Sequence, residues 1–350
     1  MSTKRIIEAF ERWRKEQRSL VLATVFGTEG STYSKAGHRI VIADNGDYQG
    51  LVSGGCLEGD LAEHAKSVLE NGQSLALTYD LRDEADEIWG MGIGCNGVIQ
   101  VLLQRLDAAS GYEPYQTLAQ QHMSGPPTLC ATVIESDDKT LEPGATFIND
   151  DTNRFGWHLP ENHQAIIAQQ IASMPTTSPP QLVDHQSEAG AFTALYAPVH
   201  PLPRLLVLGG GPDAVPLVNM AEEIGWLVTV VDHRAAYLES GGFDTAEKML
   251  CIAPEQLENN IELDRFVAIV IMSHHLESDR AYLNQLVDSD AAYIGVLGPR
   301  DRRDRLIAEI DASSQLASRL KGPVGLDIGA DSPESIALSV LAEIHQTITT

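Results

Sequence analysis

Apolar residues follow two different patterns along the chain, and the change comes near residue 200. Before it, short apolar runs bounded by Gly, Asn and Ser mix with a few amphipathic helices, which indicates an α+β region. From Arg204 onward, apolar strand-like runs alternate regularly with helical spacing. Pro198, Pro201 and Pro203 mark a linker between the two patterns. We therefore expect two domains, residues 1–198 and 199–350.

The N-terminal domain is expected to be α+β. Ile6, Ile7, Phe10 and Trp13 share one helical face, and a second helical pattern follows residue 56 and closes at Asn71-Gly72. Residues 107–127 are typical of a helix and a turn. Strand-like runs cover residues 19–27, 39–44, 48–52, 74–81, 98–106, 128–136 and 191–199.

The C-terminal domain alternates strands and helices. We expect strands over residues 204–209, 226–232, 249–253, 266–273 and 292–298, with a further strand end at 323–329. Helices are expected over 213–224, 279–287 and 302–310, and from Pro333 onward, where Ser332 is a suitable N-cap. This order predicts a parallel sheet with helices on both faces.

A glycine-rich loop joins the first strand and helix of this domain. Gly209 permits a tight turn, Gly211 lets a phosphate approach the backbone, and Ala214 keeps the helix close to the sheet. Asp232 ends the next strand about 20 residues later, where an acidic residue holds a ribose hydroxyl. The fold class is therefore α/β, a C-terminal Rossmann-type doubly wound parallel sheet with an N-terminal α+β domain.

Asp213 and His274 are two further residues that affect which ligand the glycine-rich loop can bind. Asp213 places a carboxylate in the first helical turn, where we expect it to satisfy the helix N–H groups and repel a diphosphate. A Rossmann fold that has lost its dinucleotide is therefore the alternative. His274 follows a strand at the carboxyl edge of the sheet, where ligands bind, and is a further candidate. Its plainer interpretation is a strand-end turn with a helix cap at Ser278 or Asp279.

A thiol lies in a glycine loop of the N-terminal domain. Cys56 follows Gly54 and Gly55 and opens a helix, a position that favours the thiolate. Glu58 is two residues further on and is a candidate of the same site, whereas Glu63 is expected to be a helix-dipole partner. A soft metal or a sulfur-bearing ligand would select such a thiolate.

The other three cysteines divide into two kinds. Cys95 lies in the glycine loop 92–97 and is a second candidate thiol, although packing is the plainer interpretation for both loop cysteines. Cys130 and Cys251 lie in apolar strands and are expected to be buried core residues. The spacing contains no CxxC pair, so it argues against a structural zinc site.

The charge of the chain argues against two classes of binding partner. The 350 residues contain 24 Lys and Arg against 49 Asp and Glu, a formal net charge of −25. Such a chain repels phosphate backbones and anionic membranes, so we expect no nucleic-acid and no membrane partner. The N-terminus has no apolar signal core and no long apolar run occurs, so a cytoplasmic location with reduced thiols is expected.

Four segments together resemble the XdhC/CoxI family, whose members serve molybdenum hydroxylases. The resemblance is carried by GSTYSKAGHRIVI with GLVSGGCLEGDL (30–61), GMGIGCNGVIQVL (90–102), PRLLVLGGGPDAVPL with GWLVTVVDHR (203–234), and YIGVLGPRDRRDRL with PVGLDIGADSPESIALSVLAEI (293–344). The SGGC-x-EGD segment and the GLDIGA tail are specific to it. Residues 107–198 carry little of the resemblance.

The resemblance implies a chaperone that binds molybdenum cofactor (molybdopterin), protects it while a cysteine desulfurase exchanges an oxo ligand for sulfur, and inserts it into an enzyme such as xanthine dehydrogenase. Cys56 would contact the molybdenum or its sulfur, and Cys95 is second. The Rossmann loop would hold the pterin phosphate. Basic residues of the family's first loop correspond here to Lys35, His38 and Arg39. The resemblance also implies a homodimer and no turnover of its own.

Two other function classes stay open. An NAD(P)-dependent oxidoreductase would use the glycine loop and Asp232, with Arg234 leaving recognition of a 2′-phosphate undecided. A nucleotide-sensing regulator without chemistry would give the glycine-flanked thiols no purpose. Neither the client enzyme nor the bound form of the cofactor follows from the sequence.

Overall fold

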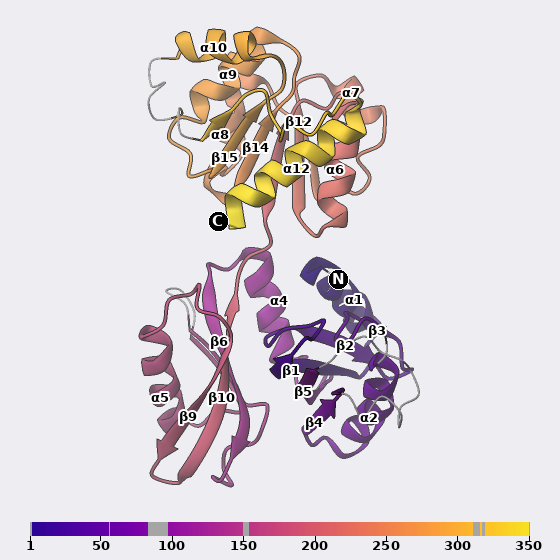
Figure 1. Ribbon diagram of the computed structural model, residues 1–350, viewed down its shortest axis with the longest axis vertical. Coiled ribbons are helices and arrows are strands. Elements are labelled where there is room, and N and C mark those ends of the chain that lie inside the picture. Colours follow the sequence, from indigo (N-terminus) through magenta and orange to yellow (C-terminus); the bar gives the residue numbers. More distant parts are fainter. Residues whose placement is uncertain are drawn as a thin grey trace. The chain divides into compact units, whose positions relative to one another are not determined.

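A computed structural model describes residues 2–55, 57–82, 97–149, 154–310, 316 and 319–349. The chain divides into two compact units, Met1–Pro201 and Leu202–Thr350 (Figure 1). The first unit contains two antiparallel five-stranded sheets and the second contains one parallel six-stranded sheet. The predicted α/β class, with an α+β N-terminal part, is confirmed.

The first sheet has the order β3-β2-β1-β5-β4. Val21, Ala23 and Val25 alternate along β1 and face Leu61 and Ala65 of the covering helix, as the period of two in a strand requires. The elements are α1 (Thr3–Lys15), β1 (Leu20–Gly30), β2 (Arg39–Ala43), β3 (Tyr48–Gln49), α2 (Glu58–Asn71), β4 (Leu75–Asp80) and β5 (Gly97–Leu106).

The second sheet has the order β8-β7-β6-β10-β9, and α5 covers its outer face through Ile167 and Ile171. Its other face meets the first sheet, where Phe26 and Leu102 pack with Ile134 and Leu195. The elements are α4 (Tyr115–Ser124), β6 (Thr128–Ser136), β7 (Thr146–Asn149), β8 (Arg154–Trp157), α5 (Glu161–Ala172), β9 (Gln181–Ser187) and β10 (Gly190–Val199).

The parallel sheet has the order β13-β12-β11-β14-β15-β16, so the order in which strands are added to the sheet reverses between β11 and β14. Ligands bind at such a switch point, at the carboxyl ends of the strands. The strands are β11 (Arg204–Leu208), β12 (Leu227–Asp232), β13 (Lys248–Cys251), β14 (Ala268–Ile271), β15 (Tyr293–Val296) and β16 (Leu320–Lys321). The strand end expected at 323–329 is wrong, because the last strand stops at Lys321 and a loop follows.

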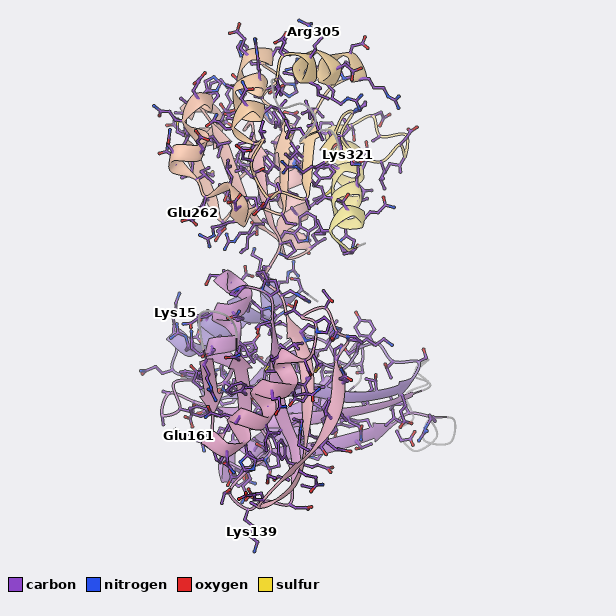
Figure 2. All side chains as sticks on the ribbon, turned by 90° about the vertical axis from the view of Figure 1, so that its left-hand side faces the viewer. Lys15, Lys139, Glu161, Glu262, Arg305 and Lys321 are labelled. Atoms are coloured by element: carbon purple, nitrogen blue, oxygen red, sulfur yellow. The ribbon has the colours of Figure 1, made fainter. Side chains whose placement is uncertain are left out.

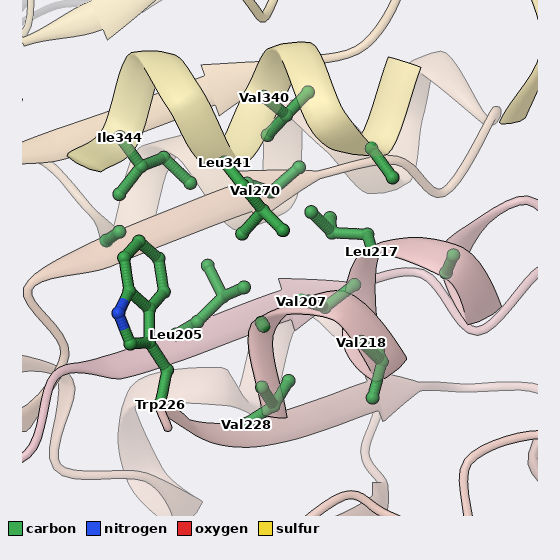
Figure 3. Packing of buried hydrophobic residues seen from close by; sticks show 14 of the residues in the cluster. Leu205, Val207, Leu217, Val218, Trp226, Val228, Val270, Val340, Leu341 and Ile344 are labelled. Carbon is green, nitrogen blue, oxygen red and sulfur yellow. The ribbon is translucent and has the colours of Figure 1, made fainter. Parts of the chain in front are cut away.

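Helices cover both faces of this sheet. On one face α6 and α12 pack on it, and Figure 3 shows Leu341 and Ile344 of α12 facing Val270 and Trp226. On the other face Tyr282, Leu283 and Leu306 belong to the covering layer. The helices are α6 (Ala214–Glu223), α7 (Ala235–Glu239), α8 (Leu257–Asn260), α9 (Leu276–Gln285), α10 (Arg300–Ala308) and α12 (Pro333–Thr349), with 3₁₀ turns at Pro254–Gln256 and Leu263–Arg265.

The two cysteines expected in the core differ. Cys130 is buried in β6, as predicted, but Cys251 is exposed. Cys251 ends β13, an edge strand whose burial pattern is mostly exposed, so the apolar run MLCIA did not imply a covered strand. Its sulfur lies 3.6 Å from the His233 carbonyl oxygen.

The surface carries the charge. Figure 2 shows Glu161, Glu262 and Arg305 on the outside of their units. Among the described residues no helix is long and apolar enough to cross a membrane.

Candidate functional site

The glycine loop of the parallel sheet is a tight turn that only glycine fits. Gly209 has φ +129°, and a Cβ there would lie 2.5 Å from the Met272 carbonyl oxygen. The Gly209 N–H donates to the Val231 carbonyl oxygen at 2.8 Å, which ties the turn to β12. Ala214 is fully buried at the start of α6, so the helix packs directly on the sheet.

Asp232 lies at the end of β12, where the sequence placed it, but its carboxylate is already bonded within the chain. Oδ2 accepts from the Gly210 N–H at 2.8 Å and from Arg234 Nη2 at 2.7 Å. Oδ1 accepts from Arg234 Nε at 2.9 Å and from the Arg234 N–H at 2.8 Å. Burial alone raises the pKa of Asp232, but the bonds from Arg234 and Gly210 outweigh it and lower the pKa below its ordinary value.

The partner of Asp232 also forms an aromatic contact. The Arg234 guanidinium carbon lies 3.9 Å from the centre of the Tyr237 ring. This edge of the sheet therefore presents a guanidinium on an aromatic ring, in place of a free ribose-binding carboxylate. A ribose hydroxyl would have to share or displace the bonds of Arg234.

Asp213 does not act as the sequence suggested. It occupies the N-cap position of α6, yet its side chain makes no cap hydrogen bond. Its Oδ2 lies 2.8 Å from His274 Nε2, and its Oδ1 lies 2.6 Å from where a Cβ on Gly211 would be. The backbone of Asp213 is helical, which turns the carboxylate toward the loop and away from the first-turn N–H groups. The Asp213 carboxylate thus lies next to Gly211.

His274 follows the end of β14 and has φ +60°, an uncommon conformation for a residue with a Cβ. The helix cap expected at Ser278 or Asp279 is instead His275, whose side chain accepts from the Ser278 N–H. Asp279 is buried and accepts from Ser273 Oγ and, at 2.7 Å, from Arg302 Nη2. Asp279 therefore fixes the strand end next to His274 and is a structural support.

In the N-terminal unit, Glu58 is fully buried and organises the loop that precedes α2. Its Oε1 accepts from the N–H groups of Val52 at 2.6 Å and Ser53 at 2.9 Å. Its Oε2 accepts from the Gly55 N–H at 2.9 Å and Ser53 Oγ at 3.0 Å. Burial alone raises the pKa of Glu58, but the N–H groups of Ser53 and Val52 lower it overall. All four bonds are local, so Glu58 acts as the anchor of this loop.

The loop held by Glu58 is open on its outer side. Gly54 and Gly55 are exposed, with φ values of +81° and +117°. A Cβ on Gly55 or on Gly59 would meet no atom within 4 Å. Because Gly54 and Gly55 adopt left-handed backbone, the N–H groups of the loop turn inward to Glu58.

A single segment, residues 31–34, lies next to described residues that flank the two cysteines in sequence, Gly54 and Gly97. A Cβ on Gly54 would lie 3.7 Å from Tyr33 Cδ2. A Cβ on Gly97, just after the other loop, would lie 2.8 Å from Thr32 Cγ2 and 3.0 Å from the Ser31 carbonyl oxygen. The described flanks of the two loops therefore converge. Cys56 and Cys95 themselves lie outside the described residues.

Sequence reasoning missed one polar group beside this loop. Tyr79 of β4 donates to Asp60 Oδ2 at 2.7 Å, and His64 Nε2 lies 3.5 Å from the same oxygen. Burial and the bond to Asp60 raise the pKa of Tyr79, so it stays a neutral donor. The EGD motif contained the signal, since its Asp lies in the first turn of α2. Glu63 pairs with Lys66 at 2.7 Å in solvent.

The candidates therefore form two groups. Gly54, Gly55 and Glu58 belong to the first unit, whereas Gly209, Gly211, Ala214, Asp232 and His274 gather at one edge of the second. Within the part of the chain that the structure describes, no group of three or more His, Cys, Asp or Glu side chains could hold a metal ion.

Two sequence profiles match the chain. The profile of the XdhC Rossmann domain matches residues 205–344. The profile of the XdhC and CoxI family matches residues 13–80. The first profile covers the candidate group at the Rossmann loop and the second covers the group around Glu58. The predicted family is the one found.

Relatives extend the match over nearly the whole chain. A probable xanthine dehydrogenase subunit from Bacillus subtilis (strain 168) is 33% identical over 334 residues, 95% of this chain and 94% of that protein. The molybdenum cofactor insertion chaperone PaoD from Escherichia coli (strain K12) is 22% identical over 330 residues, 93% of this chain and 83% of PaoD. A crystal structure of a xanthine dehydrogenase from Bacillus halodurans shares the fold with a TM-score of 0.77 at 30% identity, covering 98% of this chain and 95% of that chain. The chain therefore belongs to the XdhC and CoxI family.

Proposed function

We propose that this protein binds molybdenum cofactor as cargo, protects it during sulfuration and inserts it into a molybdenum hydroxylase related to xanthine dehydrogenase. The observation that carries the proposal is the loop built around Glu58, whose four bonds hold Gly54 and Gly55 open beside Cys56. Two relatives support it by name, one a probable component of xanthine dehydrogenase and the other a cofactor insertion chaperone.

The loop suits a large cargo with a soft metal. The glycines leave open space, so a bulky ligand can approach the backbone next to the thiol. Thiolates are the protein ligands that soft metal centres prefer. On this proposal Cys56 contacts molybdenum or its sulfur, Cys95 is the second thiol, and Glu58 positions the loop without touching the cargo.

The Rossmann unit has a candidate phosphate site of its own in this proposal. The turn at Gly209 and Gly211 and the N-terminus of α6 would hold the pterin phosphate, and His274 would donate to it. Asp232 keeps the loop in shape through the Gly210 N–H. The shielded Asp232 disfavours ordinary NAD as the ligand, because its carboxylate is committed to Arg234.

The partners follow from the same proposal. The hydroxylase receives the cofactor, a cysteine desulfurase supplies the sulfur, and the protein acts as a homodimer in the cytoplasm without turnover of its own. The net charge of −25 opposes binding to nucleic acid or anionic membranes.

The test is cofactor binding by the purified protein, measured through bound molybdenum and pterin after gel filtration. Cys56→Ser is expected to weaken binding by at least about tenfold, because a hydroxyl replaces the thiolate. Cys251→Ser is the matched control, since this exposed thiol lies in the other unit. Cys95→Ser measures how much the second thiol contributes to cofactor binding compared with Cys56.

Three outcomes would contradict the proposal. One is no cofactor binding by the wild-type protein at micromolar concentration. Another is equal binding by wild type, Cys56→Ser and Cys95→Ser. The third is saturable NAD(P)H binding in place of cofactor binding. With turnover of a substrate it would favour an oxidoreductase, and without turnover it would favour a nucleotide sensor.

A further inference from the structure

Tyr33 is an exposed aromatic residue on a loop that is otherwise firmly fixed. Its relative exposure is 56%, the largest among the exposed large hydrophobic residues of the described chain. A single exposed aromatic is ordinary on a mobile loop, because its contacts would cost the ordering of that loop. The backbone around Tyr33 decides whether this residue is different.

The residues on both sides of Tyr33 are anchored. Ser34 is fully buried, and its Oγ donates to the Leu51 carbonyl oxygen at 2.8 Å, just before the Glu58-bound loop. Thr32 Oγ1 donates to the Ser34 carbonyl oxygen at 2.9 Å, and its methyl group fills the space that Gly97 leaves without a side chain. These two bonds restrain the backbone on either side of Tyr33, so less entropy has to be lost on binding than on an unanchored loop.

One edge of the ring borders the open space beside Gly54, and the side chain is largely exposed. Cδ2 and Cε2 lie 3.7 and 3.9 Å from a Cβ position on Gly54, and the neighbouring Gly55 offers no side chain. Tyr48 is the useful contrast within the same unit. It is 40% exposed on the two-residue edge strand β3, six residues before Gly54, but none of its atoms lies within 4 Å of a Cβ position on Gly54 or Gly55.

We propose that Tyr33 stacks on the flat heteroaromatic ring of a pterin and so sets the orientation of the cargo beside the glycine loop. This inference rests on the proposed function and adds a binding residue to it. An aromatic ring on an anchored backbone, beside two residues without side chains, accommodates a planar ligand, because stacking needs one flat face and no competing side chain. The hydroxyl of Tyr33 has no part in this role.

The experiment uses the full-length protein and two ligands, the molybdenum cofactor and neopterin, a free pterin without metal or phosphate. Tyr33→Ala is expected to weaken both by about tenfold, the usual scale for loss of a stacking partner, and to abolish the quenching of neopterin fluorescence. Tyr33→Phe keeps the ring and is expected to bind within about twofold of wild type. Tyr48→Ala is the matched control and should equal wild type. Thermal unfolding should be unchanged in all three variants, since each side chain is exposed.

The outcomes separate this inference from the proposed function. If wild type binds neopterin through Tyr33 but does not bind the cofactor, stacking holds and the chaperone role fails. If the cofactor binds equally to wild type and Tyr33→Ala, stacking is overturned and the chaperone role stands. Equal losses in Tyr33→Phe and Tyr33→Ala overturn stacking, because the ring would not matter. Loss of hydroxylase docking with unchanged binding of both ligands would assign Tyr33 to the protein partner instead.

Discussion

The anchor of the glycine loop gives the sharpest prediction. In Glu58→Gln, the amide oxygen can still accept the hydrogen bonds from the N–H groups of Val52 and Ser53. The amide nitrogen then faces the Gly55 N–H. Two donors would then face each other, and the amide nitrogen of the buried side chain would lack this acceptor. Ser53 Oγ can adapt by rotating, since a hydroxyl both donates and accepts.

The cost follows from the bonds that are lost. A hydrogen bond to a charged group contributes about 1.5–3 kcal/mol, and a buried donor without a partner costs about 1–3 kcal/mol. One such bond fails outright and the others lose the charge, so we expect local destabilisation of about 3 kcal/mol. In hydrogen exchange that corresponds to roughly 100-fold faster exchange of the loop amides.

Hydrogen exchange followed by mass spectrometry, on a peptide spanning residues 50–62, measures this directly. Glu63→Gln is the matched control on the same helix, because Glu63 is 70% exposed and pairs only with Lys66 nearby. Cofactor binding should fall in Glu58→Gln and not in Glu63→Gln. Exchange rates that are equal in wild type and Glu58→Gln would refute the reasoning, since the four contacts would then contribute nothing to loop order.

Two further predictions concern other groups. Burial lowers the pKa of His122 from 6.5 to about 4 in the folded protein. The neutral form is therefore favoured by folding, and its contribution to the free energy of unfolding is complete above pH 6.5. About 2 kcal/mol of this free energy should be lost on lowering the pH to 5. His122→Gln should lack this share of the pH dependence in urea unfolding, and identical pH profiles would contradict the assignment. At the Rossmann loop, Asp213→Asn should strengthen ADP binding by about tenfold, because a carboxylate beside Gly211 repels phosphate, whereas His274→Ala should weaken it. Calorimetric titration checks both, and losses of similar size in the two variants would mean that the pair is only structural.

Local sequence patterns predicted most strands of the first sheet and of the parallel sheet, but they missed β7, β8, α5 and β9 in the polar middle segment. The alternation of strands and helices after Arg204 correctly predicted a parallel sheet, because helices must cover both faces of such a sheet. Gly209 could be assigned from the chain alone, since a strand, a glycine turn and a helix in succession require left-handed backbone. The last strand was placed wrongly because the glycines of GLDIGA belong to a loop that pairs with no strand.

The alternation of elements in the Rossmann unit, the family resemblance and the two glycine loops depend on residues close together in the chain, so the sequence alone predicts them. The partners of side chains were decided by the tertiary structure instead. Glu58 turns to the backbone N–H groups of its own loop, and Asp213 turns to His274, which is far away in sequence. Cys251 is exposed because its strand lies at an edge, and Tyr33 meets Gly54 because Ser34 ties two loops together. Burial and hydrogen bonding at these positions depend on neighbours that the chain brings together only by folding.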